Sequence, residues 1–267
     1  MTAPHFETIR FERRGASAWI ILDRPDAMNS MSPQMVGEIG AALDAAEADK
    51  AVRCVVITGT GRAFCAGADL KAVKGLSDAA GQEDAMRSFL AAASGLLRRI
   101  ELLPLPVIAA VNGLALAGGL EITLACDLVV AADSAKFGDA HAKYGLIPGW
   151  GASVRLPRKI GANRTKQMMF TADHVPAATM KDWGLVNEVV SADQLEPAVQ
   201  ALAARITDKS PLGLSRMKKL VDGGLEQPID VALRNERTMV EAHSTSHDRR
   251  EGLAAFAAKR PPEFNGT

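Results

Sequence analysis

The chain has 267 residues, with 31 lysines and arginines against 31 aspartates and glutamates, so its formal net charge at pH 7 is zero. Apolar residues make up 48% of the chain and charged residues 23%, which is the balance of a soluble globular protein and excludes a disordered one. Without net positive charge there is no field to neutralise phosphates, so we expect no nucleic-acid partner.

The cysteines and the N-terminal segment indicate a cytoplasmic protein. Cys54, Cys65 and Cys126 are an odd number without short spacing, whereas zinc sites and disulfide frameworks require pairs. We therefore expect reduced thiols and no metal. Residues 1–14 contain no apolar stretch, so we expect no signal peptide. The most apolar segment, 105–132, is interrupted by a proline and acidic residues, which indicates buried core rather than a membrane span.

The first part of the chain predicts short strands and a helix. Strands are expected at 6–12 and 18–22, around a turn at Gly15. Ser32-Pro33 is expected to begin a helix that continues to about residue 49, because serine is a favoured N-cap and proline a favoured first residue. The continuous apolar run 54–58 predicts a strand buried on both faces.

A similar order of strand, glycine-containing turn and helix then recurs, which predicts stacked βαβ-like units of the α/β class. A Gly- and Ala-rich loop is expected at 59–71 and a turn at Asn112-Gly113. The remaining expected strands are 106–111, 128–131, 135–137 and 186–190. The expected helices are 83–100, 117–125, 161–170, 177–183, 193–207, 211–225, 229–242 and 246–260. No linker separates the two halves, so the C-terminal helices are expected to pack on the core or on a neighbouring subunit.

Two loops of small residues follow buried strands and are the first candidates for a site. One covers residues 64–70 and the other residues 112–121. Small residues let the backbone approach a ligand closely, and two such loops side by side could direct two peptide N–H groups at one oxygen. Gly118-Gly119 would also lie at a helix N-terminus, which favours negative charge. The loops therefore predict an oxyanion hole rather than a phosphate cradle.

Glu121 is the candidate carboxylate of this region. It stands in the first turn of a predicted helix, within an otherwise apolar stretch. One interpretation is a residue that stabilises the helix dipole or caps the helix. The other is a general base held beside the oxyanion hole.

Together these segments resemble the enoyl-CoA hydratase/isomerase (crotonase) superfamily. The segments that carry the resemblance are 22–25, 64–70, 112–121, 137–138, 147–149 and 251–260. The resemblance implies a spiral of ββα units over residues 1–195 and a helical trimerisation region over residues 196–267. It also implies a homotrimer or a dimer of trimers, with coenzyme A as part of the substrate and no separate cofactor.

The resemblance assigns roles to individual residues. The peptide N–H groups of Ala68 and Gly118 would hold the thioester oxygen as an enolate forms, and Glu121 would be a catalytic glutamate. The residues implied to contact coenzyme A are Arg24, Ala27, Met28, Ala66, Asp69 and Leu70, together with Phe256 and Lys259 from a neighbouring subunit.

The chain departs from the family pattern at His141. Hydratases carry a second catalytic glutamate four residues after the phenylalanine that corresponds to Phe137, and here that position is histidine. Histidine can exchange protons near neutral pH and could pair with Glu121. The alternative is a polar residue that lines the acyl pocket, and Asp139 is expected to cap the following helix.

The sequence therefore predicts an acyl-CoA enzyme, with hydration of a 2-enoyl-CoA as the first hypothesis. An isomerase, a decarboxylase or a thioester hydrolase would use the same oxyanion hole. A protein that only binds acyl-CoA is the alternative outside enzymes. The depth of the acyl pocket is expected to depend on residues 71–89.

Overall fold

The computed structural model describes residues 6–74 and 81–267. Residues 1–5, part of the segment in which we expect no signal peptide, lie outside the described residues. The same holds for residues 75–80 of the segment expected to set the acyl pocket.

The strands form two sheets. The larger sheet has the order β1-β2-β3-β5-β7-β10; β1 and β2 pair antiparallel, and the other pairs are parallel. Its strands are β1 (Ile9–Arg14), β2 (Ser17–Leu22), β3 (Cys54–Gly59), β5 (Val107–Val111), β7 (Leu128–Ala132) and β10 (Glu188–Val190). The smaller sheet has the order β4-β6-β8-β9, with β4 (Ala63–Cys65), β6 (Leu114–Leu116), β8 (Lys136–Gly138) and β9 (Val175–Pro176).

The chain winds as a spiral that alternates between the two sheets. β3 is followed by β4, β5 by β6, and β7 by β8, so each turn gives one strand to each sheet. A helix or helices then return the chain to the next turn. The fold prediction of an α/β spiral of ββα units is thereby confirmed.

The predictions were wrong about several short elements. β4 lies inside the segment predicted as a loop, and β6 directly follows the predicted turn at residues 112–113. Three-residue strands contain too little periodic pattern to detect. The helix α5 (Ala152–Ile160) was also missed, because Pro157 stands inside it and proline normally ends a helix pattern.

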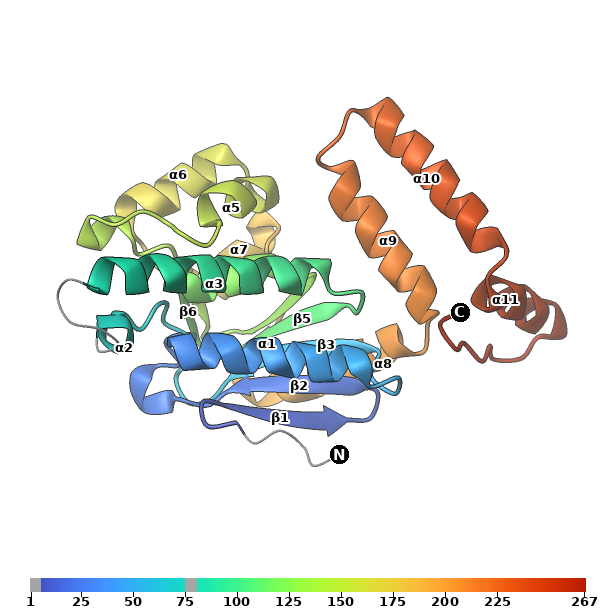
Figure 1. Ribbon diagram of the computed structural model, residues 1–267, viewed down its shortest axis with the longest axis horizontal. Coiled ribbons are helices and arrows are strands. Elements are labelled where there is room, and N and C mark those ends of the chain that lie inside the picture. Colours follow the sequence, from blue (N-terminus) through green and yellow to red (C-terminus); the bar gives the residue numbers. More distant parts are fainter. Residues whose placement is uncertain (1–5, 75–80) are drawn as a thin grey trace.

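Helices cover the larger sheet on both sides. α1 (Pro33–Ala48) and α3 (Gln82–Leu102) lie in front of it in Figure 1, and α8 (Leu195–Thr207) lies behind it. Ser32 caps α1 as predicted, since its Oγ accepts a hydrogen bond from the Met35 N–H at 3.1 Å. The buried side chains of α8 belong to the same core as the strands. The expected boundary between the ββα core and the helical region, after residue 195, therefore falls at the first residue of α8, which is a helix of the core. The part of the chain that stands away from the core begins with α9.

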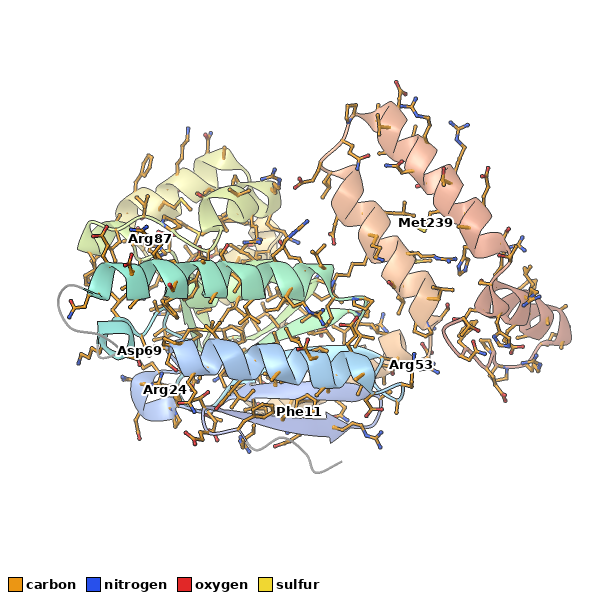
Figure 2. All side chains as sticks on the ribbon, viewed as in Figure 1. Phe11, Arg24, Arg53, Asp69, Arg87 and Met239 are labelled. Atoms are coloured by element: carbon orange, nitrogen blue, oxygen red, sulfur yellow. The ribbon has the colours of Figure 1, made fainter. Side chains whose placement is uncertain are left out.

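The last three helices project from the core, as Figure 1 shows at the right. They are α9 (Pro211–Gly224), α10 (Ile229–Ser244) and α11 (His247–Ala258). The Lys218 ammonium of α9 contacts the Asp127 carboxylate of the core at 2.8 Å and lies 3.3 Å from the carbonyl oxygens of Ile100 and Leu105. Arg53, labelled in Figure 2 near this junction, donates a hydrogen bond to the Phe264 carbonyl at 2.6 Å.

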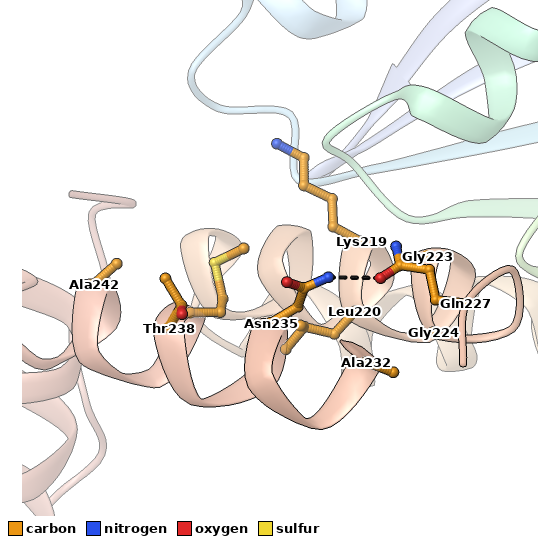
Figure 3. A pocket seen from close by; sticks show the side chains of 10 residues that line it. Lys219, Leu220, Gly223, Gly224, Gln227, Ala232, Asn235, Thr238 and Ala242 are labelled. Carbon is orange, nitrogen blue, oxygen red and sulfur yellow. Dashed lines mark hydrogen bonds between the residues drawn. The ribbon is translucent and has the colours of Figure 1, made fainter. Parts of the chain in front are cut away.

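The projecting helices carry many exposed apolar side chains. They are Met217, Val221, Leu225, Ile229, Leu233, Val240, Leu253 and Phe256, and Phe256 is 83% exposed. A groove of about 330 Å³ lies between α9 and α10, with Leu220, Ala232 and Met239 in its wall (Figure 3). Exposed apolar side chains gathered in this number on the projecting helices are unusual for a monomeric globular protein.

The chemical expectations for cysteines and membrane spans can be compared with the described residues. Cys54, Cys65 and Cys126 are free and buried, as predicted. In the parts of the chain that the structure describes, no helix combines the length and apolar character that crossing a bilayer requires. The same parts contain no group of three or more His, Cys, Asp or Glu side chains suited to a metal ion.

Candidate active site

The two loops of small residues lie side by side, because β4 and β6 are neighbours in the smaller sheet. Ala68 follows β4, and Gly118 is the first residue of α4 (Gly118–Ala125) after β6. A methyl group at Gly67 would lie 3.4 Å from the peptide nitrogen of Gly118, so the loops touch. Among the described residues, the N–H groups of Ala68 and Gly118 have no acceptor. Two unused donors at adjacent loops fit the predicted oxyanion hole.

Ala117 turns the chain into α4 through a strained conformation. Its φ is +47° and its ψ is −114°, a combination that a side chain with Cβ rarely adopts. The Ala117 N–H donates to the Gly138 carbonyl at 2.8 Å, which anchors the residue to β8. Gly118 then lies against Trp150, since a methyl group at Gly118 would meet the Trp150 Cζ3 at 2.0 Å. The backbone at this point is therefore fixed by neighbours on both sides.

Glu121 is buried, with 1% of its surface exposed, and is held through one oxygen. Its Oε1 accepts hydrogen bonds from the peptide N–H groups of Trp150 at 2.8 Å and Ala152 at 3.0 Å. Oε2 accepts none from the described residues. Burial raises the pKa of Glu121; the two peptide donors and the charge of His141 lower it, and the net pKa stays above its ordinary value.

The loop that holds Glu121 depends on Gly151. This glycine has a φ of +108°, in the left-handed region that favours glycine, and it lets the peptide groups on either side of it face one carboxylate oxygen. Arg155 braces the loop, donating to the Trp150 carbonyl at 2.5 Å and to the Glu101 carboxylate at 2.8 Å. The position of the Glu121 carboxylate is thus set by α3 and α5 as well as by α4.

His141 follows β8 and precedes the short helix η2 (Ala142–Tyr144). Its side chain is largely buried, and its Nδ1 lies 3.1 Å from the Asp139 Oδ1 without the geometry of a hydrogen bond. Burial lowers the pKa of His141, but the contact with Asp139 and the charge of Glu121 raise it more, so the net pKa lies above its ordinary value. Glu121 and His141 each shift the pKa of the other, so the two side chains lie within electrostatic range of each other.

The prediction that Asp139 caps the following helix was wrong. His141 is the N-cap residue of η2, and no side chain caps that helix. The Asp139 Oδ1 accepts only a 3.3 Å hydrogen bond from the His141 N–H, within its own turn. The D-x-H spacing at 139–141 was the available sequence signal that Asp139 lies beside the histidine.

Most of the residues implied to contact coenzyme A come together at one end of the molecule. The segment 24–31 runs beside the loop 66–69, with hydrogen bonds from Ala66 N to Met28 O at 3.0 Å and from Met31 N to Gly67 O at 2.8 Å. Ala27 lies in the first of these segments, and Leu70 directly follows the second. The segment implied to bind coenzyme A therefore braces the loop that carries Ala68.

Arg24 is already engaged within the chain. Its guanidinium donates to the Asp69 carboxylate at 2.8 Å and to the Ser30 carbonyl at 2.6 Å, and Figure 2 labels both Arg24 and Asp69 at the same end of the molecule. Burial raises the pKa of Asp69, but hydrogen bonds from Ala72 and Arg24 lower it more, so the carboxylate is ionised at neutral pH. The pair ties the two segments together.

Phe256 and Lys259 are not brought to this site by their own chain. α11 lies at the opposite end of the molecule from α2 (Leu70–Lys74) in Figure 1, and both residues are exposed. Their implied role requires a neighbouring subunit.

Comparison with known proteins agrees with this architecture. The family model for enoyl-CoA hydratase/isomerase matches residues 12–267. A crotonyl-CoA hydratase from Syntrophomonas wolfei is 37% identical over 97% of this chain and 98% of its own length. A short-chain-enoyl-CoA hydratase from Clostridium acetobutylicum is 34% identical over 94% and 95%. The crystal structure of an enoyl-CoA hydratase from Bacillus anthracis has a TM-score of 0.92, with 35% identity over 98% of this chain and all of that one.

The ββα spiral and the family match over nearly the whole chain define an enzyme of the hydratase/isomerase class. The chain belongs to the enoyl-CoA hydratase/isomerase family.

Proposed function

We propose that this protein adds water across the double bond of a 2-enoyl-CoA thioester. The observation that carries the proposal is the position of Glu121: a buried carboxylate with one unused oxygen, three residues along α4 from Gly118 and within electrostatic reach of His141. Relatives of nearly equal length are named crotonyl-CoA hydratase and short-chain-enoyl-CoA hydratase. Their names support a short acyl chain as the first substrate to test.

The proposed reaction uses three features of the site. Glu121 takes a proton from water, and the hydroxide forms a bond to the β-carbon while the double-bond electrons move to the thioester oxygen. The N–H groups of Ala68 and Gly118 stabilise the resulting enolate. Protonated His141 gives its proton to the α-carbon, and the proton on Glu121 returns to His141 before the next turnover. The sum is one water added to the substrate.

We also propose that the enzyme works in the cytoplasm as a trimer or a dimer of trimers. The exposed apolar side chains of the projecting helices support the assembly, since a second copy would bury them. Such an assembly would bring Phe256 and Lys259 of one subunit to the coenzyme A of another. The molar mass in solution tests it: a monomer of 28.2 kDa would contradict the proposal.

The activity is tested by mixing the purified protein with crotonyl-CoA and following the ultraviolet absorbance of the conjugated thioester. Rapid loss of absorbance in the wild type, abolished by Glu121→Ala and strongly reduced by His141→Ala, would support the hydratase. If crotonyl-CoA binds but its absorbance persists, simple hydration is excluded.

Isomerisation of a 3-enoyl-CoA is the second candidate. His141 stands where a hydratase has its second glutamate, and moving a proton between the α- and γ-carbons requires only one well-placed base. With 3-enoyl-CoA as substrate, a rise in conjugated absorbance that depends on Glu121 but not on His141 would favour this activity.

A further inference from the structure

Asp139 is a buried acid to which the reaction above gives no role. It is 1% exposed, at the end of β8. Its Oδ1 lies 3.1 Å from the Nδ1 of His141, and its Oδ2 has no hydrogen-bond partner among the described residues. A buried carboxylate in this state is costly unless a charged neighbour compensates it.

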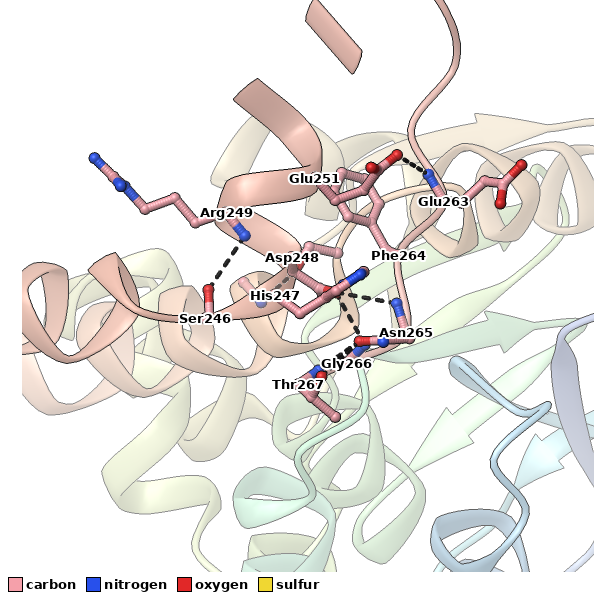
Figure 4. Close-up of polar contacts among 12 residues, drawn as sticks. Ser246, His247, Asp248, Arg249, Glu251, Glu263, Phe264, Asn265, Gly266 and Thr267 are labelled. Carbon is pink, nitrogen blue, oxygen red and sulfur yellow. Dashed lines mark hydrogen bonds and ion pairs between the residues drawn. The ribbon is translucent and has the colours of Figure 1, made fainter. Parts of the chain in front are cut away.

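A second buried aspartate shows what a purely structural carboxylate looks like in this chain. Asp248 is also 1% exposed, and it accepts hydrogen bonds from the Ser210 Oγ at 2.5 Å and from the N–H groups of Asn265 at 3.0 Å and Gly266 at 3.1 Å (Figure 4). Its contacts fix the C-terminal segment to α11. Among the residues that the structure describes, Asp139 has no comparable set of donors, and its ion-pair partner is His141.

We propose that Asp139 is a positioning residue for the hydration reaction proposed above: it holds the His141 ring by Nδ1, stabilises the imidazolium and leaves Nε2 to deliver the proton. Of the two ring nitrogens, Nδ1 is the one that lies buried beside the carboxylate. Nε2 is on the other side of the ring and has no partner in the described part of the chain. An aspartate beside Nδ1 orients the ring and favours its charged form.

Among the charged groups around His141, Asp139 and Glu121 are the ones that affect its protonation. Glu121 faces it from α4, and both carboxylates favour the imidazolium. The other ionisable side chains on the elements that surround this turn are exposed to solvent; they are Lys136, Lys143, Arg164, Lys166, Asp173 and His174. Exposed charges act weakly because water screens them.

In the proposed step the Nε2–H bond of the imidazolium breaks and the new C–H bond forms at the α-carbon, with the electron pair supplied by the enolate. His141 becomes neutral. Asp139 takes no proton in this step. Between turnovers the proton that Glu121 received from water restores the imidazolium.

The experiment measures the protonation of His141 independently of activity. Diethyl pyrocarbonate acylates neutral imidazole, so the rate of modification of the His141 peptide, followed by mass spectrometry against pH, reports the titration of that ring. In the wild type we expect the midpoint for His141 above the ordinary value of histidine, because Asp139 and Glu121 favour the charged ring. In Asp139→Asn we expect it to fall by about one pH unit or more. Asp182→Asn, which changes an exposed carboxylate on α7 (Ala177–Trp183), serves as control and should leave it unchanged.

Turnover of crotonyl-CoA is measured on the same proteins. Asp139→Asn should lower kcat roughly tenfold or more with a small change in KM, and the alkaline limb of its pH profile should move to lower pH. An unchanged His141 midpoint in Asp139→Asn would overturn the inference even if the enzyme is an active hydratase. If the wild type does not hydrate crotonyl-CoA, the proposed function fails while the midpoints still decide the Asp139–His141 relationship. If Asp139→Asn does not fold, a wild-type His141 midpoint at or below the ordinary value of histidine is sufficient to reject the inference.

Discussion

Trp150 donates its peptide N–H to Glu121 across 29 residues of sequence, at 2.8 Å from the Oε1. With the second donor from Ala152, this bond fixes one carboxylate oxygen and leaves the other without a partner in the described structure. The folded chain therefore holds the carboxylate in one orientation, and in the proposed reaction this lowers the cost of reaching the reactive arrangement. The consequences for activity and stability can be tested one at a time.

Replacing Glu121 with glutamine should abolish turnover while acyl-CoA binding remains. Glutamine keeps an oxygen that can accept the peptide bonds from Trp150 and Ala152, but its amide cannot take a proton from water. We expect kcat for crotonyl-CoA to fall by roughly 10²–10⁴-fold, with little change in the affinity measured by calorimetry. Retained turnover would mean that another group is the base.

Replacing Gly118 with alanine should disable the oxyanion hole. The new methyl group would meet the Trp150 ring at 2.0 Å, so either the ring or the Gly118 peptide must move. Loss of one oxyanion donor costs roughly 10²–10³-fold in kcat. The matched control is Gly37→Ala in α1, where nothing lies within 4 Å and activity should be unchanged. Equal activity of the two variants would argue against a role for the Gly118 N–H.

The pH dependence of kcat/KM should be bell-shaped. Glu121 must be deprotonated to act as a base, and its pKa is raised by burial, so activity is lost as pH falls through a value above that of an ordinary carboxyl group. His141 must be protonated to act as an acid. Burial lowers its pKa, but Asp139 and Glu121 raise it more, so activity is lost only as pH rises through a value above that of ordinary histidine. The two limbs report the coupled pair.

The activity that remains in His141→Ala, measured over the same range of pH, shows which limb of the profile depends on His141. It should keep the acid limb and lack the alkaline one. An alkaline limb that survives this substitution would assign the proton donor to a different group.

Replacing Lys218 with methionine should weaken the attachment of the projecting helices. The substitution removes the charged partner of the Asp127 carboxylate and two contacts with core carbonyls. The side chains of Lys218 and Asp127 are both mostly buried. We expect a loss of about 3 kcal/mol in the free energy of unfolding. Urea denaturation at fixed protomer concentration measures it, with exposed Lys219→Met as control. Equal stabilities would show that the ion pair contributes little.

The sequence predicted the elements with long apolar runs and missed those that depend on their partners. β3, β5 and β7 are buried strands of five or six residues and were found, whereas β4 and β6 have three residues each and depend on pairing with strands that are distant in the sequence. For Glu121 the sequence left capping and base chemistry open. The hydrogen bonds that hold its carboxylate come from residues 150 and 152, and the sequence of its own helix gives no indication of them.

Each turn of the spiral delivers one component to the site from the end of its strand in the smaller sheet. Ala68 follows β4, Gly118 and Glu121 follow β6, and Asp139 with His141 follows β8. In the proposed reaction, the part that binds the carbonyl and the part that donates the proton therefore come from separate stretches of chain. Replacing the β8–η2 segment with that of a two-glutamate relative would change the proton donor, while the residues of the proposed oxyanion hole stay the same. Separate parts of this kind would let one scaffold supply several reactions of the same enolate intermediate.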